Sequence, residues 1–451
     1  MAQSVTGNEE EVTESSIAPI GKTQRLAVLD VLRGFALLGI LMMNIEDFSG
    51  PNLLPRFPIG IAKAAFIGWH ANLDYFILAA KWLFFEGKMR GMFSLLFGAS
   101  AVLLIERIER RGRSDQAADI FLRRNMWLVL IGFIHGALIW DGDILIFYGL
   151  CGLLILFPFR NVGPKKLIAL GLTVWLVGGT LAMSHSLHIP KVMEEGAQLA
   201  KATAAKKDGA ALTKAQQAML DADAKKKIEA KKNIDQDILK GRAGYVQSVT
   251  PRFLGRLRVI PIVFTSGRIA ETIGAMLLGM GLYRNGFLSG RRSTRAYLAT
   301  AAAGYAITVP IVLVGLWQTK LGGFSFAAAV QWMYLPYCIE QAPGTLANAA
   351  IVILLVRSRY MRSAFNALGA VGRTALSNYI LTSVACQFIF AWGPWKLYGT
   401  LEYYQCVLVV ATIWSANLLL SSLWLRVFVF GPLEWAWRSL TYWRWQPLIS
   451  A

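Results

Sequence analysis

Three ionisable residues lie close together within one apolar stretch of the chain. The segment "IGFIHGALIWDGDILIFYGL" (131–150) places His135 shortly before a Gly-containing turn that carries Asp141 and Asp143. A carboxylate bonded to one imidazole nitrogen fixes the tautomer and raises the basicity of the ring, which leaves the other nitrogen for a substrate. The pattern predicts a general base, His135, with an orienting acid. A buried structural histidine is the alternative.

A second apolar run also carries paired charges. In "LDVLRGFALLGILMMNI" (29–45), Asp30 and Arg33 lie three residues apart on one face of a predicted helix and can pair with each other. They form either a structural ion pair near the membrane interface or an anion contact near the inner mouth of a cavity. Asn44, at the outer end of the same run, is a further candidate for substrate binding.

The remaining candidates interrupt other apolar segments, where a charge is costly and therefore points to function. His70 lies in an outer segment, on the same predicted side of the membrane as His135, and is a second candidate base. Further candidates for substrate or cofactor binding are Arg268 and Glu271, three residues apart, and Arg373 and Asn378, at the start of a later run. Arginines at helix ends either contact phosphates or anchor the helix at the interface.

The composition indicates a membrane protein. Hydrophobic residues make up 55% of the 451 residues and charged residues only 16%, whereas soluble domains average about 25% charged residues. Apolar runs of about 20 residues recur along the chain and predict an all-α, polytopic helical membrane protein with about 10 transmembrane helices. The expected spans are near 26–46, 91–106, 121–140, 143–159, 165–184, 257–283, 296–318, 340–356, 374–395 and 402–426.

Two segments complicate this count. Residues 66–88 are apolar but hold several charged side chains, which predicts an in-plane or re-entrant amphipathic helix. Residues 324–339 raise the count to about 11 or 12 if they span the membrane. Lys/Arg-rich loops alternate between the expected spans, so the positive-inside rule places both termini in the cytoplasm.

The polar segments divide the chain into five expected regions. Residues 1–24 are expected to form a disordered cytoplasmic tail, 25–184 an N-terminal transmembrane half with the candidate active site, 185–256 an extracytoplasmic Ala/Lys-rich helical loop, 257–428 a C-terminal transmembrane half, and 429–451 an interfacial aromatic and basic segment.

Charge and residue spacing exclude several function classes. The net charge of +19 fits basic loops that meet anionic lipid head groups, so the bilayer and not nucleic acid is the expected partner. The four cysteines lie far apart in apolar surroundings, and the four histidines lack the spacing of metal ligands, so no metal site or disulfide framework is expected. No P-loop or G-x-G-x-x-G motif supports an ATP- or NAD-dependent reaction. The number of copies in the membrane stays open, a homodimer included.

Six segments in order resemble the signature blocks of YeiB-type bacterial inner-membrane proteins. They are "LDVLRGFALLGILMMNI", "MFSLLFGAS", "HGALIWDGDILIFYGL", "MLLGMGLYRNG", "GRTALSNYI" and "FGPLEWAWRSLTYWRWQPL". That family is remotely similar to transmembrane acyltransferases that include heparan-alpha-glucosaminide N-acetyltransferase. In this enzyme acetyl-CoA binds from the cytosol and a histidine near the outer face serves acetyl transfer to an amino sugar. By position that histidine matches His70, so the resemblance leaves both histidines as candidates.

The resemblance implies a membrane-embedded acyltransferase of the bacterial inner membrane. It would move an acyl group, expected to be acetyl, from cytoplasmic acyl-CoA to an acceptor at the outer face: a sugar, a glycolipid or another envelope component. Arg33, Arg373 and the arginines of 284–295 are the expected phosphate contacts. Two alternatives remain: a transporter of a small organic solute or lipid, and a scaffold subunit that docks through residues 185–256.

Overall fold

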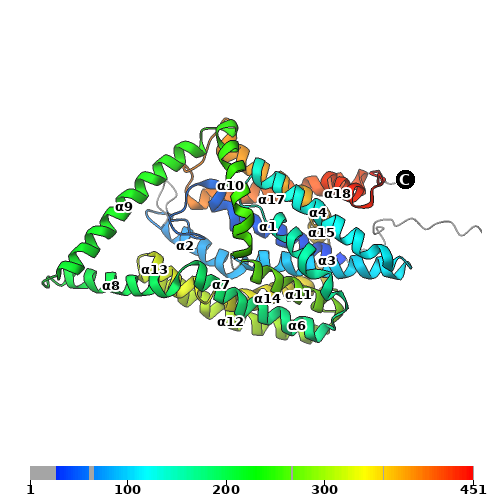
Figure 1. The fold of residues 1–451 in the computed structure, drawn as a ribbon, viewed down its shortest axis with the longest axis horizontal. Coiled ribbons are helices and arrows are strands. Elements are labelled where there is room, and N and C mark those ends of the chain that lie inside the picture. The colour runs from blue at the N-terminus through cyan, green and yellow to red at the C-terminus, as the bar shows by residue number, and fades with distance from the viewer. Residues whose placement is uncertain (1–26, 60–65, 266–267, 359, 450–451) are drawn as a thin grey trace, which may run out of the picture.

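The computed structural model describes residues 27–59, 66–265, 268–358 and 360–449. These residues form helices joined by short turns, with two isolated β-bridges and no strand, which confirms the predicted all-α class. Long helices pack side by side, and α8 and α9 project from them as a hairpin (Figure 1). The predicted disordered tail, 1–24, lies outside the described residues.

The helices follow the apolar segments predicted from the sequence. Their bounds are α1 Ala27–Ser49, α2 Ala71–Ala80, α3 Lys88–Arg110, α4 Ser114–Leu138, α5 Leu145–Cys151, α6 Pro164–Thr173, α7 Gly179–Ser186, α8 Ile189–Lys207, α9 Lys214–Gly241, α10 Tyr245–Thr265, α11 Arg268–Arg284, α12 Thr294–Leu321, α13 Phe326–Ala329, α14 Tyr337–Ser358, α15 Arg362–Arg373, α16 Ala375–Gln387, α17 Tyr403–Val427 and α18 Pro432–Tyr442. Short π-helical turns, such as Lys81–Phe85 and Phe388–Trp392, extend several of them.

Seven helical stretches in the described residues are long and apolar enough to cross a membrane. They are Ala27–Ser49, Ala71–Arg110, Pro164–His185, Thr294–Leu321, Tyr337–Ser358, Ala375–Trp392 and Tyr403–Val427. The other expected spans fall on α4, on α5 with the π-helical turn after it, and on α10 and α11, which are shorter or more polar. The protein is therefore a multi-pass helical protein, and the side on which each loop lies stays a prediction.

Residues 66–88 are continuous with the helix that follows them. Helix α2 runs through the π-helical turn Lys81–Phe85 and reaches α3 after a break at Gly87. Gly87 has a φ of 72°, a conformation that glycine adopts readily and other residues avoid. Together these elements make one interrupted apolar stretch, Ala71–Arg110. Residues 71–88 therefore form the first part of an interrupted apolar helical stretch, and whether they lie in the plane of the membrane or cross it stays a prediction.

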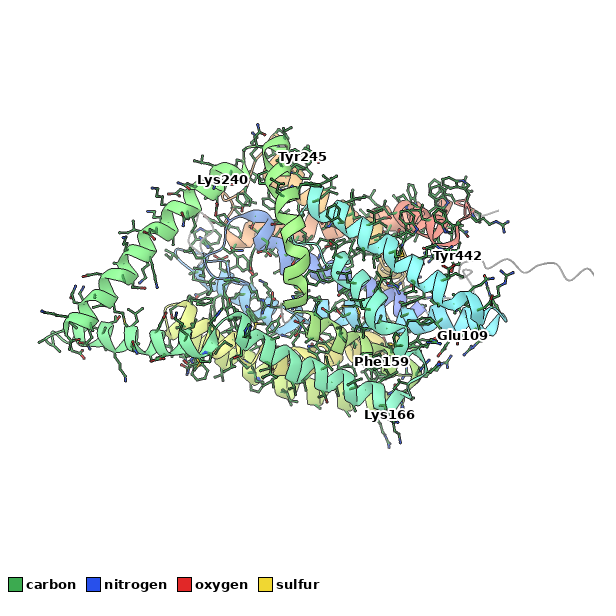
Figure 2. The ribbon with its side chains drawn as sticks, in the orientation of Figure 1. Glu109, Phe159, Lys166, Lys240, Tyr245 and Tyr442 are labelled. Atoms are coloured by element: carbon green, nitrogen blue, oxygen red, sulfur yellow. The ribbon has the colours of Figure 1, made fainter. Side chains whose placement is uncertain are left out.

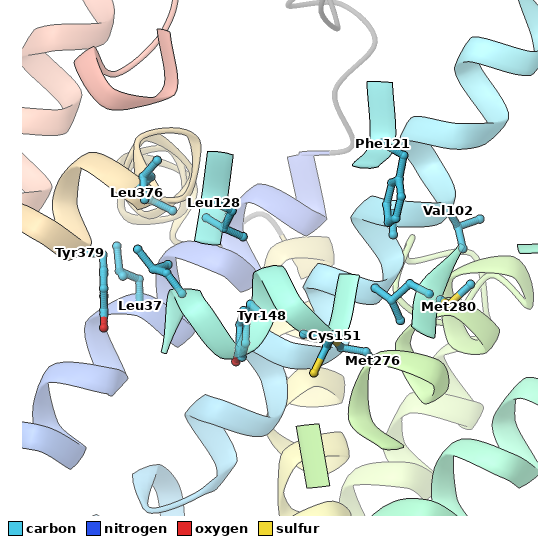
Figure 3. Packing of buried hydrophobic residues seen from close by; sticks show 14 of the residues in the cluster. Leu37, Val102, Phe121, Leu128, Tyr148, Cys151, Met276, Met280, Leu376 and Tyr379 are labelled. Carbon is cyan, nitrogen blue, oxygen red and sulfur yellow. The ribbon is translucent and has the colours of Figure 1, made fainter. Parts of the chain in front are cut away.

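The core forms around α1, which is buried on most of its surface and packs against α3, α15, α16 and α17. Figure 3 shows part of this core, a cluster that includes Leu128, Tyr148, Leu376 and Tyr379. Glycines allow backbones to approach where helices cross: Gly279 of α11 meets the backbone of Leu95 in α3. Such small-residue crossings are typical of helices packed in membranes, where close contact replaces the hydrophobic effect.

The segment 185–256 forms the hairpin of α8 and α9 and most of α10, which returns to the bundle. No residue of α9 is buried, and Lys240, near its C-terminal end, is exposed on the outside of the molecule (Figure 2). A capping box at Thr213 and Gln216 starts α9. The Nε of Arg242 donates to the carbonyl of Tyr398 at 2.7 Å and ties the hairpin to the bundle.

Candidate functional site

His135 and Asp143 form a buried pair. His135 lies in the last turn of α4, only 1% exposed, and its Nδ1 is 2.9 Å from Oδ2 of Asp143. The other oxygen of Asp143 accepts a hydrogen bond from the amide of Ile146 at 3.1 Å, which fixes the carboxylate. This arrangement favours a proton on Nδ1 and leaves the Nε2 lone pair available. Nε2 is buried and has no hydrogen-bond partner among the described residues.

Aromatic rings enclose the imidazole of His135. The ring of Tyr379 lies 5.0 Å away and that of Trp140 lies 6.5 Å away, centroid to centroid. Asp141, also predicted for this site, is exposed on the turn, so Asp143 is the residue that orients the histidine.

His70 makes a similar pair but has carboxylates at both nitrogens. Its Nδ1 is 2.6 Å from Oδ2 of Asp74, and its Nε2 is 3.6 Å from Oε2 of Glu402. The other oxygen of Asp74 accepts from the amide of Tyr404 at 3.1 Å. These contacts join the start of α2 to the start of α17. The geometry therefore favours a structural role for His70 and leaves His135 as the histidine with an available Nε2.

A cavity of about 220 Å³ lies between α1, α3, α4, α5, α15, α16 and α18. Its walls are largely apolar, but six arginines line it against two carboxylates, Asp30 and Glu434. The arginines are Arg33, Arg107, Arg111, Arg124, Arg373 and Arg438. Glu109 at the end of α3 and Tyr442 at the end of α18 mark this end of the molecule (Figure 2). Guanidinium groups bind phosphate and carboxylate in bidentate fashion, so the cavity is suited to an anion.

Several of these guanidinium groups have no carboxylate of their own. Arg33 pairs with Asp30 at 3.0 Å and donates to Ser100 at 3.0 Å. In contrast, within the part of the chain that the structure describes, no ion pair involves the three half-buried residues Arg124, Arg373 and Arg438. Unpaired positive charge away from bulk water is costly, and a bound anion would offset it.

Glu434 holds the wall of the cavity together. Its carboxylate accepts from the backbone amides of Leu376, at 2.6 Å, and Ser377, at 3.1 Å, and from the Ser377 hydroxyl at 2.6 Å. It thus caps the N-terminus of α16, where a negative charge is favoured. Burial raises the pKa of Glu434 above its usual range, and the hydrogen bonds from Ser377 oppose that shift.

Two other predicted residues have structural partners. Asn378 donates to Ser421 at 2.7 Å and to Thr374 at 2.9 Å, and it does not line the cavity. Glu271 pairs with Arg90 at 2.9 Å and accepts from Gln341 at 2.5 Å. Its expected neighbour Arg268 begins α11, and its side chain lies outside the described residues.

The sequence did not reveal a network of buried ion pairs around α2 and α3. Lys81 contacts Glu46 at 2.6 Å, and Lys88 pairs with Glu340. In the sequence, the only sign of these ion pairs is the presence of lysines in an otherwise apolar segment. The acidic partners lie far along the chain, so the pairing depends on helix packing.

The apolar helices define a multi-pass helical membrane protein, and its basic cavity, lined by Tyr379 whose ring lies 5.0 Å from that of His135, is a candidate anion site. The chain belongs to the YeiB family, whose function is unknown. It is 30% identical over 447 residues to "Uncharacterized protein YeiB" of Escherichia coli (strain K12). The matched region covers 95% of this chain and 99% of that relative. It is 29% identical over 436 residues to "Uncharacterized protein YxaH" of Bacillus subtilis (strain 168), 96% of this chain and 98% of the relative.

A family model confirms this membership over part of the chain. Residues 282–444 match "Protein of unknown function (DUF418)", a region that includes α16 and α18 of the cavity wall. No solved structure matches the chain. None of the matching names carries an activity, and the link to the transmembrane acyltransferases stays an expectation.

Proposed function

We propose that this protein is an acyltransferase that moves an acyl group, expected to be acetyl, from acyl-CoA to an acceptor on the other side of the membrane. One observation carries the proposal: the arginine-lined cavity ends at Tyr379, whose ring contacts the buried His135–Asp143 pair.

The cavity suits a donor with phosphates at one end and a reactive group at the other. Arg107 and Arg111 lie at the end of α3, and Arg33 bonds to Ser100 near its middle. From Arg107 to Phe93 the cavity follows fourteen residues of that helix. At 1.5 Å per residue this is about 21 Å. Phosphates held by the arginines therefore leave room for a thioester arm that reaches toward Tyr379. Arg33 and Arg373, predicted from the sequence, both belong to this group, whereas no arginine of 284–295 lines the cavity.

The residues beside Tyr379 can supply the chemistry. Nε2 of His135 takes the proton of the acceptor hydroxyl, whose oxygen forms a bond to the acyl carbon. The bond from that carbon to sulfur breaks, and His135 returns the proton to the leaving thiolate. Asp143 keeps the imidazole in the required tautomer and stabilises its protonated form. Asn44, which lines a small hollow with Tyr379, is the candidate donor to the developing oxyanion.

The same proposal includes a location and an orientation. Basic loops at 106–125, 284–295 and 357–373 favour the bacterial inner membrane with both termini and the arginine-lined mouth in the cytoplasm. His135 then lies toward the outer face, where a sugar, a glycolipid or another envelope component would be the acceptor.

The test is release of free CoA from acetyl-CoA and longer acyl-CoAs by the purified protein in nanodiscs. Loss of a general base costs about 10²- to 10⁴-fold, so we expect a loss of this size for His135→Ala with CoA binding retained. His70→Ala serves as the matched control and should remain active if it folds. Wild-type protein that neither binds nor cleaves any acyl-CoA refutes the proposal. That result would favour transport, for which the interrupted helix Ala71–Arg110 and its buried ion pairs are the supporting observations.

A further inference from the structure

A second, smaller hollow lies on the other side of Tyr379. Asn44 and Phe48 of α1, Trp140, and Thr382 and Ser383 of α16 line it together with Tyr379. Its volume of about 10 Å³ is enough for about one water molecule. The hollow is therefore much smaller than the arginine-lined cavity.

Tyr379 separates the two spaces. It lines both the large cavity and the small hollow, and its side chain is buried. Its hydroxyl lies 3.4 Å from the amide of Ile144, which follows Asp143. The His135 imidazole lies near both the Tyr379 and Trp140 rings, and both of these rings line the hollow. Displacement of the Tyr379 ring would therefore connect the two spaces next to His135.

The lining of the hollow has a definite chemical character. Among the described residues that line it, none is charged. Asn44 makes no side-chain hydrogen bond to another described residue. The Ser383 hydroxyl donates to the carbonyl of Tyr379 at 3.1 Å, and the Thr382 hydroxyl accepts from Asn417 at 3.0 Å. Asn44 is therefore the polar group of the lining that is left for a ligand. The rings of Phe48 and Trp140 stack at 4.2 Å and form an apolar surface beside these polar groups. Small-molecule sites commonly combine apolar walls with a few placed polar groups.

We propose that this hollow receives a neutral, hydroxyl-bearing acceptor and that Tyr379 is the removable wall between the acceptor and the donor cavity. With the ring displaced, His135 faces the acceptor hydroxyl and the acyl carbon at once. The hollow as an acceptor site rests on the proposed acyl transfer. The role of Tyr379 as a wall does not, because access can be measured without turnover.

The first experiment measures access to Ser383→Cys with an anionic, membrane-impermeant methanethiosulfonate in sealed vesicles. Labelling of Ser114→Cys, exposed at the first residue of α4, identifies the vesicles whose arginine side faces the reagent. From that side Ser383→Cys should react slowly, and addition of Tyr379→Ala should accelerate labelling at least tenfold. The four native cysteines are buried, and their labelling in the protein without an introduced cysteine is subtracted.

Tyr148→Ala is the matched control. Tyr148 is also a buried tyrosine that lines the large cavity, but it does not line the hollow. Its removal should enlarge the cavity without accelerating the labelling of Ser383→Cys. Equal labelling with and without Tyr379, or no labelling of a folded Tyr379→Ala variant, overturns the role of the wall even if acyl transfer is established.

A second experiment tests the acceptor class in wild-type protein that releases CoA. Glucose is the neutral hydroxylated probe and lysine is the charged amine probe. Acylated glucose without acylated lysine supports the proposal. Acylation of lysine alone, or of neither compound, overturns the acceptor assignment and leaves the proposed donor chemistry standing.

Discussion

Binding of CoA should depend on two arginines that the sequence motifs did not single out. Arg124 stacks on Trp437 with its guanidinium carbon 3.7 Å from the ring centroid, and Arg438 lies one turn beyond Glu434. A hydrogen bond to a charged group contributes about 1.5–3 kcal/mol. Since about 1.4 kcal/mol corresponds to tenfold in affinity, Arg124→Gln or Arg438→Gln should each weaken CoA binding about 10- to 150-fold. Isothermal titration calorimetry with purified protein in nanodiscs at fixed salt measures this change.

The control distinguishes a local site from general attraction to a basic surface. Arg295 is exposed, does not line the cavity, and belongs to the loop 284–295 that the sequence favoured as a phosphate contact. Arg295→Gln should change the affinity less than about twofold, because exposed charges are screened by salt. Arg124→Lys should fall between wild type and Arg124→Gln, since it keeps the charge and loses the bidentate contact. Wild-type affinity in both cavity variants, or an equal loss in Arg295→Gln, refutes the assignment.

Three further perturbations test the site and the fold. Asp143→Asn should reduce CoA release about 10²- to 10⁴-fold with unchanged CoA affinity, because the amide no longer holds the catalytic tautomer; reduced affinity would instead indicate a folding role. Glu271→Ala leaves Arg90 without its carboxylate and should lower the free energy of unfolding by about 3–5 kcal/mol, as measured by denaturant titration. Replacement of both Glu271 and Arg90 by apolar residues should restore part of this loss. Gly279→Leu places a side chain against the backbone of α3 and should abolish folded protein in size-exclusion chromatography, whereas Gly163→Ala, at a position with open space, should not.

The fold was predictable because the dominant signal is local. Runs of about 20 apolar residues require helices in a membrane, where each backbone polar group must be satisfied within its own segment. The interruption at 86–87 was harder to predict, because charged residues in 66–88 also fit a helix lying in the membrane plane. The structure joins this segment to α3 because its lysines find acidic partners, such as Glu46 of α1, that no local pattern identifies.

The site was predictable only where its residues are close in sequence. His135 and Asp143 are eight residues apart across one turn, so their pairing followed from the motif. Arg124 and Arg438 come from α4 and α18, more than 300 residues apart, and meet at the cavity only through helix packing. Glu271 was a candidate because of its charge, but its partner Arg90 lies 181 residues away, and no local spacing indicates that pair.

The two histidines show why residue type alone does not identify a base. Each has a carboxylate on Nδ1, at 2.6 Å for His70 and 2.9 Å for His135, so their first partners are equivalent. The two histidines differ at Nε2. In His70 this nitrogen faces Glu402, whereas in His135 it is buried and has no partner among the described residues. Burying an unsatisfied polar atom costs free energy. The proposed general base requires an available Nε2, and of the two histidines only His135 has one that faces no carboxylate among the described residues.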